Sequence, residues 1–429
     1  MRRLISVFIT LLPLSSFGKN ASFMREPAQG AVVFDASTAL YNPAGSVFLN
    51  KGHHISLSSL SLLRKWDIET KDQNYGRDVY VPVVPELNSV WVQDDYSIIA
   101  NFNVDGGGTT FKDGLPSYTQ IMNSTLKSGL AIQEADMKFS DASNVIIASD
   151  RLYFFNLGSA FKLSKKVSMA LGAKAVLGEK NFDAALTYRS VESKSDRDPL
   201  PGVYKLRFRE KATGAAPFVA VYADQGKWAL ASKYDFQVKL PYKVELMEDD
   251  LSPISEAANK DAVATDGSIE NNDVPAQLTL SGRYQYSESI RLGLTLARTF
   301  FQEAKQDTWQ KSMKLKREAY NNASIKGKPL LDQNAVSVSL AYVIHPNFTF
   351  SSGYVHQDVG SSSTTNVDDQ HRLDMDLFSF GFNTRFDNHS IDVALSLIQY
   401  EDSYNQDRTQ VFGQRDNIFS LGYNLSLAD

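Results

Sequence analysis

The stretch Ile418–Leu427, read as IFSLGYNLSL, alternates between large apolar side chains and small or polar ones. Its odd positions carry Phe, Leu, Tyr, Leu and Leu, and its even positions from 420 to 426 carry Ser, Gly, Asn and Ser. A period of two residues is that of a β-strand, whose successive side chains point to opposite faces of the sheet. The same alternation recurs at 276–286, 335–342 and 378–383. The chain from about residue 53 onward is therefore predicted to be all-β.

The links between successive strands alternate between short and long. Gln225-Gly226 and His345-Pro346-Asn347 are tight turns, whereas 105–144 and 302–332 are long polar links. Short turns on one side and long loops on the other are typical of outer-membrane barrels, in which the apolar face points outward. Following this alternation along the chain predicts a transmembrane antiparallel β-barrel of about fourteen strands.

The composition narrows the class of protein further. No apolar run after the first residues approaches the ~18 residues that a membrane-spanning helix needs. The 429 residues include no cysteine, which excludes thiolate metal sites, disulfides and cysteine nucleophiles. The net charge of -5 comes without a basic stripe, which argues against a nucleic-acid surface.

The residues before the first strand predict two further segments. Residues 1–20 combine a basic start, an apolar run and a small, polar end, which is typical of an export signal cleaved between Gly18 and Ala21. A barrel of fourteen strands should enclose an open lumen unless something fills it. Residues 21–52 are therefore predicted to form an N-terminal plug, or hatch, in the lumen of a barrel made by residues 53–429.

The hatch contains the stretch DASTALYNPAG at positions 35–45. Asn42-Pro43 stiffens the backbone, because proline fixes φ and lacks an N–H, and Ala44 and Gly45 permit close packing against a wall. We take Asp35 together with these four residues as the hatch motif. An ordinary turn before a strand is the alternative interpretation.

This arrangement resembles the FadL-type outer-membrane transporters of long-chain fatty acids and other hydrophobic compounds. The resemblance lies in the signal, in the hatch motif, and in pairs such as Leu157–Leu163 leading through a turn to Val167–Gly172. It covers nearly the whole chain and is most specific at the N-P-A-G sequence. It implies a fourteen-stranded barrel with a hatch, capture of a hydrophobic ligand at the extracellular loops, and lateral release into the bilayer through a kinked third strand.

The resemblance also implies where these steps occur in this sequence. The third strand, Tyr96–Val104, runs into Gly106, Gly107 and Gly108, and glycines weaken a strand and permit a kink. The candidate capture loop carries apolar residues at Leu115, Ile121, Met122, Leu126 and Leu130. Lys180, beside Glu179, is the possible partner for a fatty-acid carboxylate. A fatty acid, a neutral hydrocarbon and an aromatic compound all remain open as the ligand.

Motifs for enzyme chemistry are missing from the sequence. It has no H-E-x-x-H, G-x-S-x-G or P-loop pattern, so we expect no enzyme activity, no metal and no cofactor. The expected location is the bacterial outer membrane, and the expected partners of the monomer are a hydrophobic small molecule, membrane lipid and lipopolysaccharide, with no nucleic acid. Two alternatives remain: a barrel enzyme using His356 near Asp358, and a general porin or adhesion scaffold.

Overall fold

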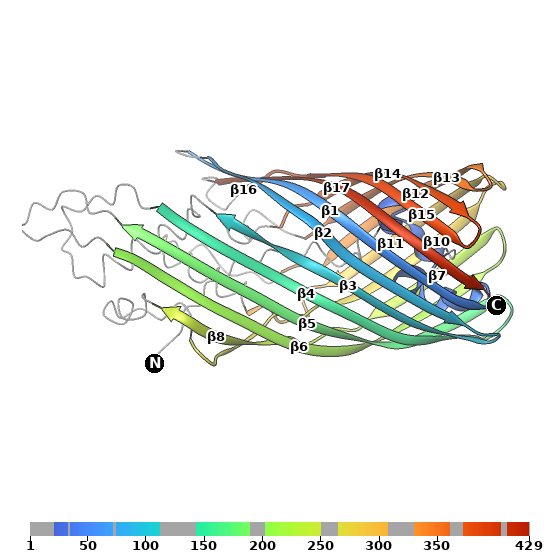
Figure 1. Ribbon diagram of the computed structural model, residues 1–429, viewed down its shortest axis with the longest axis horizontal. Helices are drawn as coiled ribbons and strands as arrows, with labels where there is room; N and C mark the ends of the chain where they lie inside the picture. Colours follow the sequence, from blue (N-terminus) through green and yellow to red (C-terminus); the bar gives the residue numbers. More distant parts are fainter. Residues whose placement is uncertain are drawn as a thin grey trace, which may run out of the picture.

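The strands form one closed antiparallel wall in the computed structural model of the protein (Figure 1). The structure describes residues 21–32, 35–71, 74–111, 143–188, 202–249, 265–307, 330–360, 372–404 and 410–428. The strands are β1 (Gly52–Thr70), β2 (Asn74–Val92), β3 (Tyr96–Phe111), β4 (Ser143–Lys162), β5 (Val167–Tyr188), β6 (Gly202–Asp224), β7 (Trp228–Asp235), β8 (Pro241–Asp249), β9 (Ile269–Asn271), β10 (Ala276–Gln285), β11 (Ile290–Phe300), β12 (Gln333–His345), β13 (Phe348–Asp358), β14 (Met375–Phe386), β15 (His389–Tyr400), β16 (Ser403–Tyr404) and β17 (Gln410–Ala428).

The wall closes where β1 pairs with both β2 and β17. Three positions in it are each shared by two consecutive strands: β7 with β8, β9 with β10, and β15 with β16. The wall is therefore a closed barrel of fourteen positions. The predicted fold class is confirmed, including the strand count and the antiparallel order.

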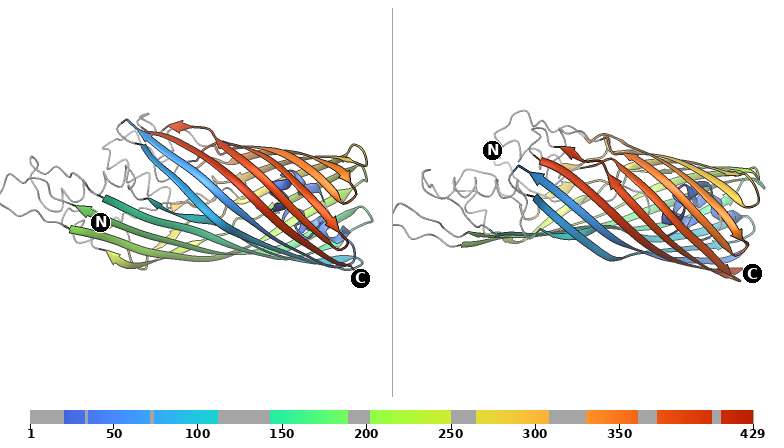
Figure 2. Two further views of the ribbon diagram at one scale, coloured as in Figure 1. Left: turned by 45° about the horizontal axis from the view of Figure 1, so that its top comes forward. Right: turned by 90° about the horizontal axis from the view of Figure 1, so that it is seen from above.

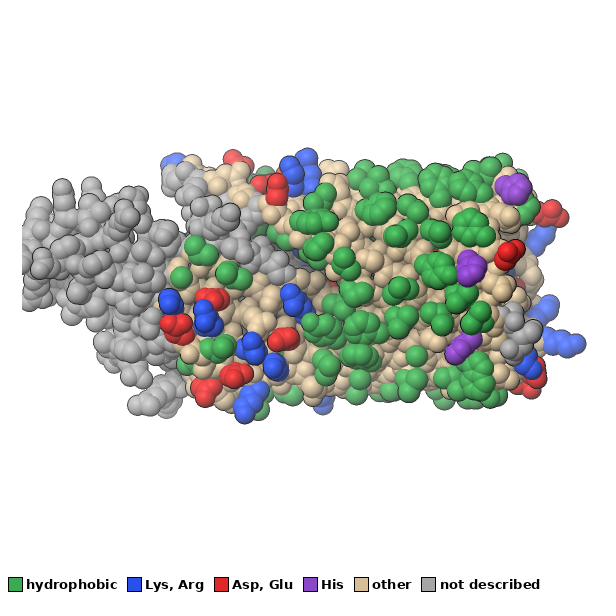
Figure 3. All heavy atoms as spheres, viewed as in Figure 1, with side chains coloured by type: hydrophobic (Ala, Val, Ile, Leu, Met, Phe, Trp, Pro, Cys, Tyr) green, Lys and Arg blue, Asp and Glu red, His purple; other side chains and the backbone are tan. Residues whose placement is uncertain are grey.

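The two faces of the wall separate by chemistry as the alternation predicts. In β17, Phe419, Leu421 and Tyr423 point outward and are 42–51% exposed, whereas Ser420 and Asn424 point inward and are buried. Figure 3 shows the outward apolar side chains gathered in a broad belt around one part of the barrel. Lys, Arg, Asp and Glu lie beyond the belt on the side of the long strands β4, β5 and β6. Such a belt is how a barrel presents itself to hydrocarbon.

Among the described strands, the ladder of backbone hydrogen bonds is interrupted between β2 and β3 and at the link between β7 and β8, as well as at the other two shared positions. The pairing of β2 with β3 runs only from Val92↔Ser97 to Glu86↔Asn103. Beyond that point β2 continues beside β1, and β3 continues beside β4. The second break is the link 236–240 between β7 and β8, where Val238 and Leu240 are fully buried.

Four short helices lie inside the barrel near its turn-bearing end (Figures 1 and 2). They are α1 (Ala21–Arg25), the 3-10 helix η1 (Gln29–Ala31), α2 (Thr38–Tyr41) and the 3-10 helix η2 (Pro43–Phe48). None of the helices in the described residues has the length and apolar character to cross a membrane. The predicted signal peptide and the predicted capture loop lie outside the described residues.

Candidate functional site

The hatch motif folds through short-range hydrogen bonds. The backbone N–H of Ser37 donates to Asp35 Oδ1 at 2.8 Å, and the hydroxyl of Thr38 donates to the carbonyl of Asp35 at 2.6 Å. The N–H of Gly45 donates to Asn42 Oδ1 at 3.0 Å, which makes Asn42 the N-cap of η2. Pro43 follows as the first helical residue, where its missing N–H costs nothing. The N-P-A-G sequence is thus a capped helix start.

Small side chains bring η2 against the inner face of the barrel. Ser168 of β5 donates its hydroxyl to the carbonyl of Ala44 at 2.5 Å, and the hydroxyls of Ser46 and Ser97 are hydrogen-bonded at 2.6 Å. Around them lies a buried cluster made largely of alanine, which consists of Ala31, Ala44, Val47, Ala160, Ala170, Ala220, Tyr222 and Ala229. Alanine on both sides lets the two backbones approach closely. The predicted close packing of Ala44 and Gly45 therefore has a matching surface on the wall.

Glycines in the wall make room for the first part of the hatch. A Cβ at Gly381 of β14 would lie 2.8 Å from Cγ of Arg25, and one at Gly353 of β13 would lie 2.5 Å from Cδ of Pro27. Any larger residue at these two positions would push the hatch away from the wall.

Buried ion pairs join the hatch to the wall. Arg25 Nε lies 2.8 Å from Asp392 Oδ1, and Arg291 of β11 holds Glu26 with two contacts of 3.0 and 2.6 Å. Burial by itself would raise the pKa of Glu26, but Arg291 and Arg25 outweigh burial and lower that pKa. Glu26 is therefore a carboxylate at neutral pH, and its charge depends on the two arginines.

Asp35 is the one hatch carboxyl with the opposite tendency. Burial, and to a lesser extent the charge of Asp392, raise its pKa to about 6, because the hydrogen bond from Ser37 and the charge of Arg25 only partly offset these two effects. The ionised form of Asp35 is thus disfavoured inside the barrel.

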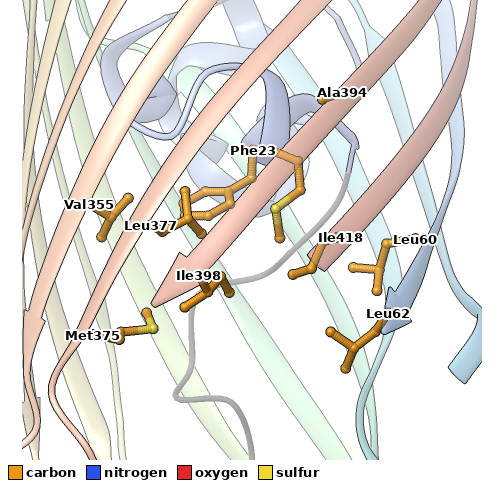
Figure 4. Close-up of a cluster of buried hydrophobic side chains, with 10 residues drawn as sticks. Phe23, Leu60, Leu62, Val355, Met375, Leu377, Ala394, Ile398 and Ile418 are labelled. Carbon is orange, nitrogen blue, oxygen red and sulfur yellow. The ribbon is translucent and has the colours of Figure 1, made fainter. Parts of the chain in front are cut away.

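Apolar side chains complete the contact between hatch and wall. Phe23 and Met24 pack with side chains of β1, β13, β14, β15 and β17 (Figure 4), namely Leu60, Leu62, Val355, Met375, Leu377, Ala394, Ile398 and Ile418. The ring of Phe23 also stacks on that of Tyr41, with 6.1 Å between the centroids.

A cavity of about 150 Å³ lies between the hatch and the interrupted part of the wall. On the hatch side it is lined by Phe23, Pro27, Gly30, Leu40 and Tyr41. On the wall side it is lined by Leu60 and Leu62 of β1, by Val81, Val84, Pro85 and Glu86 of β2, and by Asn103, Val104, Asp105 and Gly106 of β3. Both edges of the β2–β3 interruption, which we call the seam, therefore border the cavity.

Residues at both edges of the seam disfavour pairing between β2 and β3. Pro82 and Pro85 of β2 have no N–H to donate to a neighbouring strand. In β3, Gly106 has φ +96°, and a Cβ there would lie 2.1 Å from the carbonyl oxygen of Asp150. Gly107 leaves the space next to Val81 largely open, since a Cβ there would be 3.9 Å from Val81 Cγ2. Gly106, Gly107 and Gly108 pair with β4 and not with β2. The glycine interruption chosen from the sequence thus lies at the seam.

One side of the cavity, formed by residues of β5 and β7, is polar. Asp235 lies 2.7 Å from Lys174 Nζ and 3.0 Å from Lys233 Nζ, and all three residues line the cavity. This group was not predicted from the sequence, because Lys174 is separated in the chain from the other two residues. The available signal was Lys174 itself, a lysine at an inward position between two alanines.

An amide ladder leads from the seam along the inner wall. Asn156 donates to Asn101 at 2.7 Å, Asn101 to Asn88 at 2.8 Å, and Asn88 to Glu86 at 2.6 Å. These hydrogen bonds join β2, β3 and β4, and the ladder ends at Glu86, the last residue of β2 that pairs with β3.

Lys180, the candidate carboxylate partner, lies elsewhere. Its Nζ is 3.7 Å from Asp150 and 4.6 Å from the centre of the Tyr242 ring, and it does not line the cavity. His356, the residue considered for an enzyme, points outward and meets Asp376 at 3.0 Å rather than Asp358. The described part of the chain holds no cluster of His, Asp and Glu that could bind a metal.

Comparison with known proteins identifies the fold. No family model matches the sequence, and no curated protein matches it. Among solved structures, a Pseudomonas aeruginosa FadL homologue has a TM-score of 0.67 at 14% identity, over 95% of this chain and 98% of that one. The chain has the FadL-type fold. The P. putida toluene transporter TodX has a TM-score of 0.61 at 12% identity, over 92% of this chain and 95% of its own.

A third solved structure agrees. The Ralstonia pickettii toluene transporter TbuX has a TM-score of 0.56 at 13% identity, over 94% of this chain and 98% of its own. The FadL-type resemblance inferred from the sequence is confirmed for the fold over nearly the whole chain.

Proposed function

We propose that this protein carries small hydrophobic molecules across a bacterial outer membrane and releases them sideways through the seam between β2 and β3. The apolar belt supports the membrane location, because outward Leu, Val and Phe side chains at this density suit hydrocarbon and not water. The FadL-type fold supports the class of cargo, since solved structures with this fold include a FadL homologue and toluene transporters.

The observation that carries the proposal is the cavity that touches both the hatch and the seam. Phe23 and Tyr41 border it on one side, and Val81 and Gly106 border it on the other. A molecule in this cavity would be next to the one stretch of wall where β2 and β3 share no backbone hydrogen bonds. Release there leads directly to the hydrocarbon around the belt. An apolar molecule on this route never has to enter water, which is the unfavourable step for such a solute.

The size of the cavity favours a cargo of about one aromatic ring. An engineered protein cavity of roughly 150 Å³ lined by apolar residues binds benzene, and this cavity has about that volume. The polar side offers two ammonium groups, Lys174 and Lys233, to one carboxylate, Asp235. These two lysines make a fatty acid the second candidate, with its carboxylate at Lys174 and Lys233 in place of Lys180. Capture by the loop that contains Leu115, Ile121, Met122, Leu126 and Leu130 is part of the proposal.

A reversible crosslink across the seam tests lateral release. The chain contains no cysteine, so Val81→Cys with Gly107→Cys introduces the only thiols. A cysteine Sγ at position 81 takes the place of a valine γ-carbon, and a Cβ at Gly107 lies 3.9 Å from Val81 Cγ2, so the two cysteine side chains are within reach of each other. The matched control is Ser89→Cys with Ala100→Cys, which joins the same two strands where they are already paired.

The measurement is uptake of radiolabelled toluene and of oleate by cells that carry each variant. Oxidation should abolish uptake through the V81C/G107C protein, and a reducing agent should restore it. Oxidised S89C/A100C protein should transport as well as the reduced form. Normal uptake by a fully crosslinked V81C/G107C protein would refute release through the seam. If the crosslink lowers uptake of one compound more than of the other, that compound is the one that uses the seam.

A further inference from the structure

Outward charged side chains form regular rows on the long strands where the apolar belt ends. Leu177, which is 44% exposed, is the last large apolar residue on the outward face of β5. The next outward row crosses four strands and consists of Arg151, Glu179, Lys211 and Lys243, which are direct neighbours in register. This row therefore lies where the apolar belt of β5 gives way to charged residues; Figure 1 labels the four strands that carry it, and Figure 3 shows charged side chains next to the belt in the same view.

The rows farther out are neutralised by ion pairs. Arg207 contacts Asp183 at 2.9 Å, and Lys205 contacts Glu248 at 3.6 Å. Arg209 contacts Glu179 at 3.8 Å. It thereby neutralises the single negative charge of the row formed by Arg151, Glu179, Lys211 and Lys243, which we call the border row. Opposite charges side by side on an exposed face are what water-facing strands normally show.

The border row is different because none of its three cations has an anionic partner among the described residues. Arg151, Lys211 and Lys243 are exposed and form no ion pair or hydrogen bond there. Lys211 and Lys243 are directly opposite each other on β6 and β8, a position where like charges destabilise a sheet. Glu245, the next outward residue of β8, lies opposite Arg209 and pairs with none of the three cations.

We propose that Arg151, Lys211 and Lys243 bind the phosphate groups of a phosphorylated glycolipid of the outer leaflet, that is, lipopolysaccharide. The inference rests on the proposed outer-membrane location. Adjacent strands are about 4.8 Å apart, so one phosphate reaches both Lys211 and Lys243, while Arg151, two strands from Lys211, reaches a second phosphate about 10 Å away. The acyl chains then lie along the belt below Leu177. A lipid phosphate is favoured over a free anion because the cations occur where headgroups meet hydrocarbon.

Binding of purified lipopolysaccharide and of its dephosphorylated form to the detergent-solubilised full-length protein tests this proposal, with the shift in thermal unfolding as readout. The triple variant R151Q/K211Q/K243Q should lose about a hundredfold in affinity for the phosphorylated lipid, since each basic residue near an anionic surface contributes a factor of several. The matched control K205Q/R207Q removes two cations of the same face that already have partners, and it should bind nearly as the wild type. The charge-conserving variant K211R/K243R should keep binding and so separates loss of charge from misfolding.

Three outcomes would overturn the proposal: unchanged binding by the triple variant, equal binding of both lipid forms by the wild type, or full competition by millimolar inorganic phosphate. The last result would indicate a site for free anions. Toluene uptake through the wild-type protein is measured separately, so a failed lipid site and a failed transport function give different results.

Discussion

Replacement of Glu26 by glutamine should release the first part of the hatch from the wall. Glu26 has no exposed side-chain surface, and its carboxylate holds Arg291 at 2.6 Å while Arg291 is 19% exposed. Removing one partner of a buried ion pair costs about 3–5 kcal/mol. We take the lower value, about 3 kcal/mol, because Arg291 reaches some solvent and glutamine keeps one acceptor. The population of undocked hatch should then rise about a hundredfold.

Hydrogen exchange measures that population directly. Backbone amides within the hatch, such as that of Asn42, which donates to the carbonyl of Thr38 at 3.0 Å, exchange only when the segment opens. Mass spectrometry of peptides covering residues 21–51 should show exchange about a hundredfold faster in the E26Q protein than in the wild type, with the barrel strands little changed.

Asp416→Asn provides the matched control. Arg64 contacts Asp416 at 2.8 and 2.7 Å, so the geometry resembles that of Arg291 with Glu26, but here the pair joins β1 to β17 within the wall. D416N should lower the thermal stability of the barrel and leave exchange of the hatch near the wild-type rate. Hatch exchange that stays within twofold of wild type in E26Q, or rises equally in D416N, would refute the assignment of Glu26 as a hatch anchor.

Two further predictions concern single residues of the hatch and of the seam. Since burial raises the pKa of Asp35 to about 6, above its ordinary value near 4, docking of the hatch should weaken about tenfold as the pH rises from 5 to 7. The measurement is hydrogen exchange of the hatch at the two pH values, corrected for the intrinsic effect of pH on exchange. Asp35→Asn should abolish the difference between the two values. A D35N protein whose hatch exchange depends on pH as in the wild type would contradict the prediction. Gly106→Ala should lower the midpoint of thermal unfolding, because a side chain at φ +96° would meet the carbonyl of Asp150 and costs at least ~1–2 kcal/mol. Gly107→Ala, whose Cβ has open space, should leave the midpoint unchanged, and equal effects of the two substitutions would show that the strain lies elsewhere.

The wall could be predicted from the sequence because its signals are local. Alternation such as that in Ile418–Leu427 decides which side chains face lipid, and the short turns decide the strand count. The signals in the hatch motif are equally local, since Asn42 caps the helix that begins at Pro43, two residues before Gly45. All of these depend on neighbours within a few positions.

Contacts between distant parts of the chain were not predictable in the same way. Glu26 meets Arg291 across 265 positions of sequence, and Lys174 meets Asp235 from a different strand of the wall. Such pairs depend on the register of several strands, which a single sequence does not specify. Lys180 was chosen from the sequence and Lys174 was not, and only the register of the strands places Lys174 at the cavity and Lys180 beside Asp150.

The seam shows how local and distant causes combine. Gly106 marks β3 as a weak strand, yet it pairs with β4 along its whole length. The interruption requires the facing edge as well, where Pro82 and Pro85 cannot donate to a neighbour. Neither strand alone predicts a break, because a glycine opposite a normal strand can still accept and donate. The break also has to lie beside the hatch to matter, and Pro27, which follows Glu26, borders the same cavity as Pro85. The ion pair that anchors the hatch therefore also determines how much space lies behind the seam.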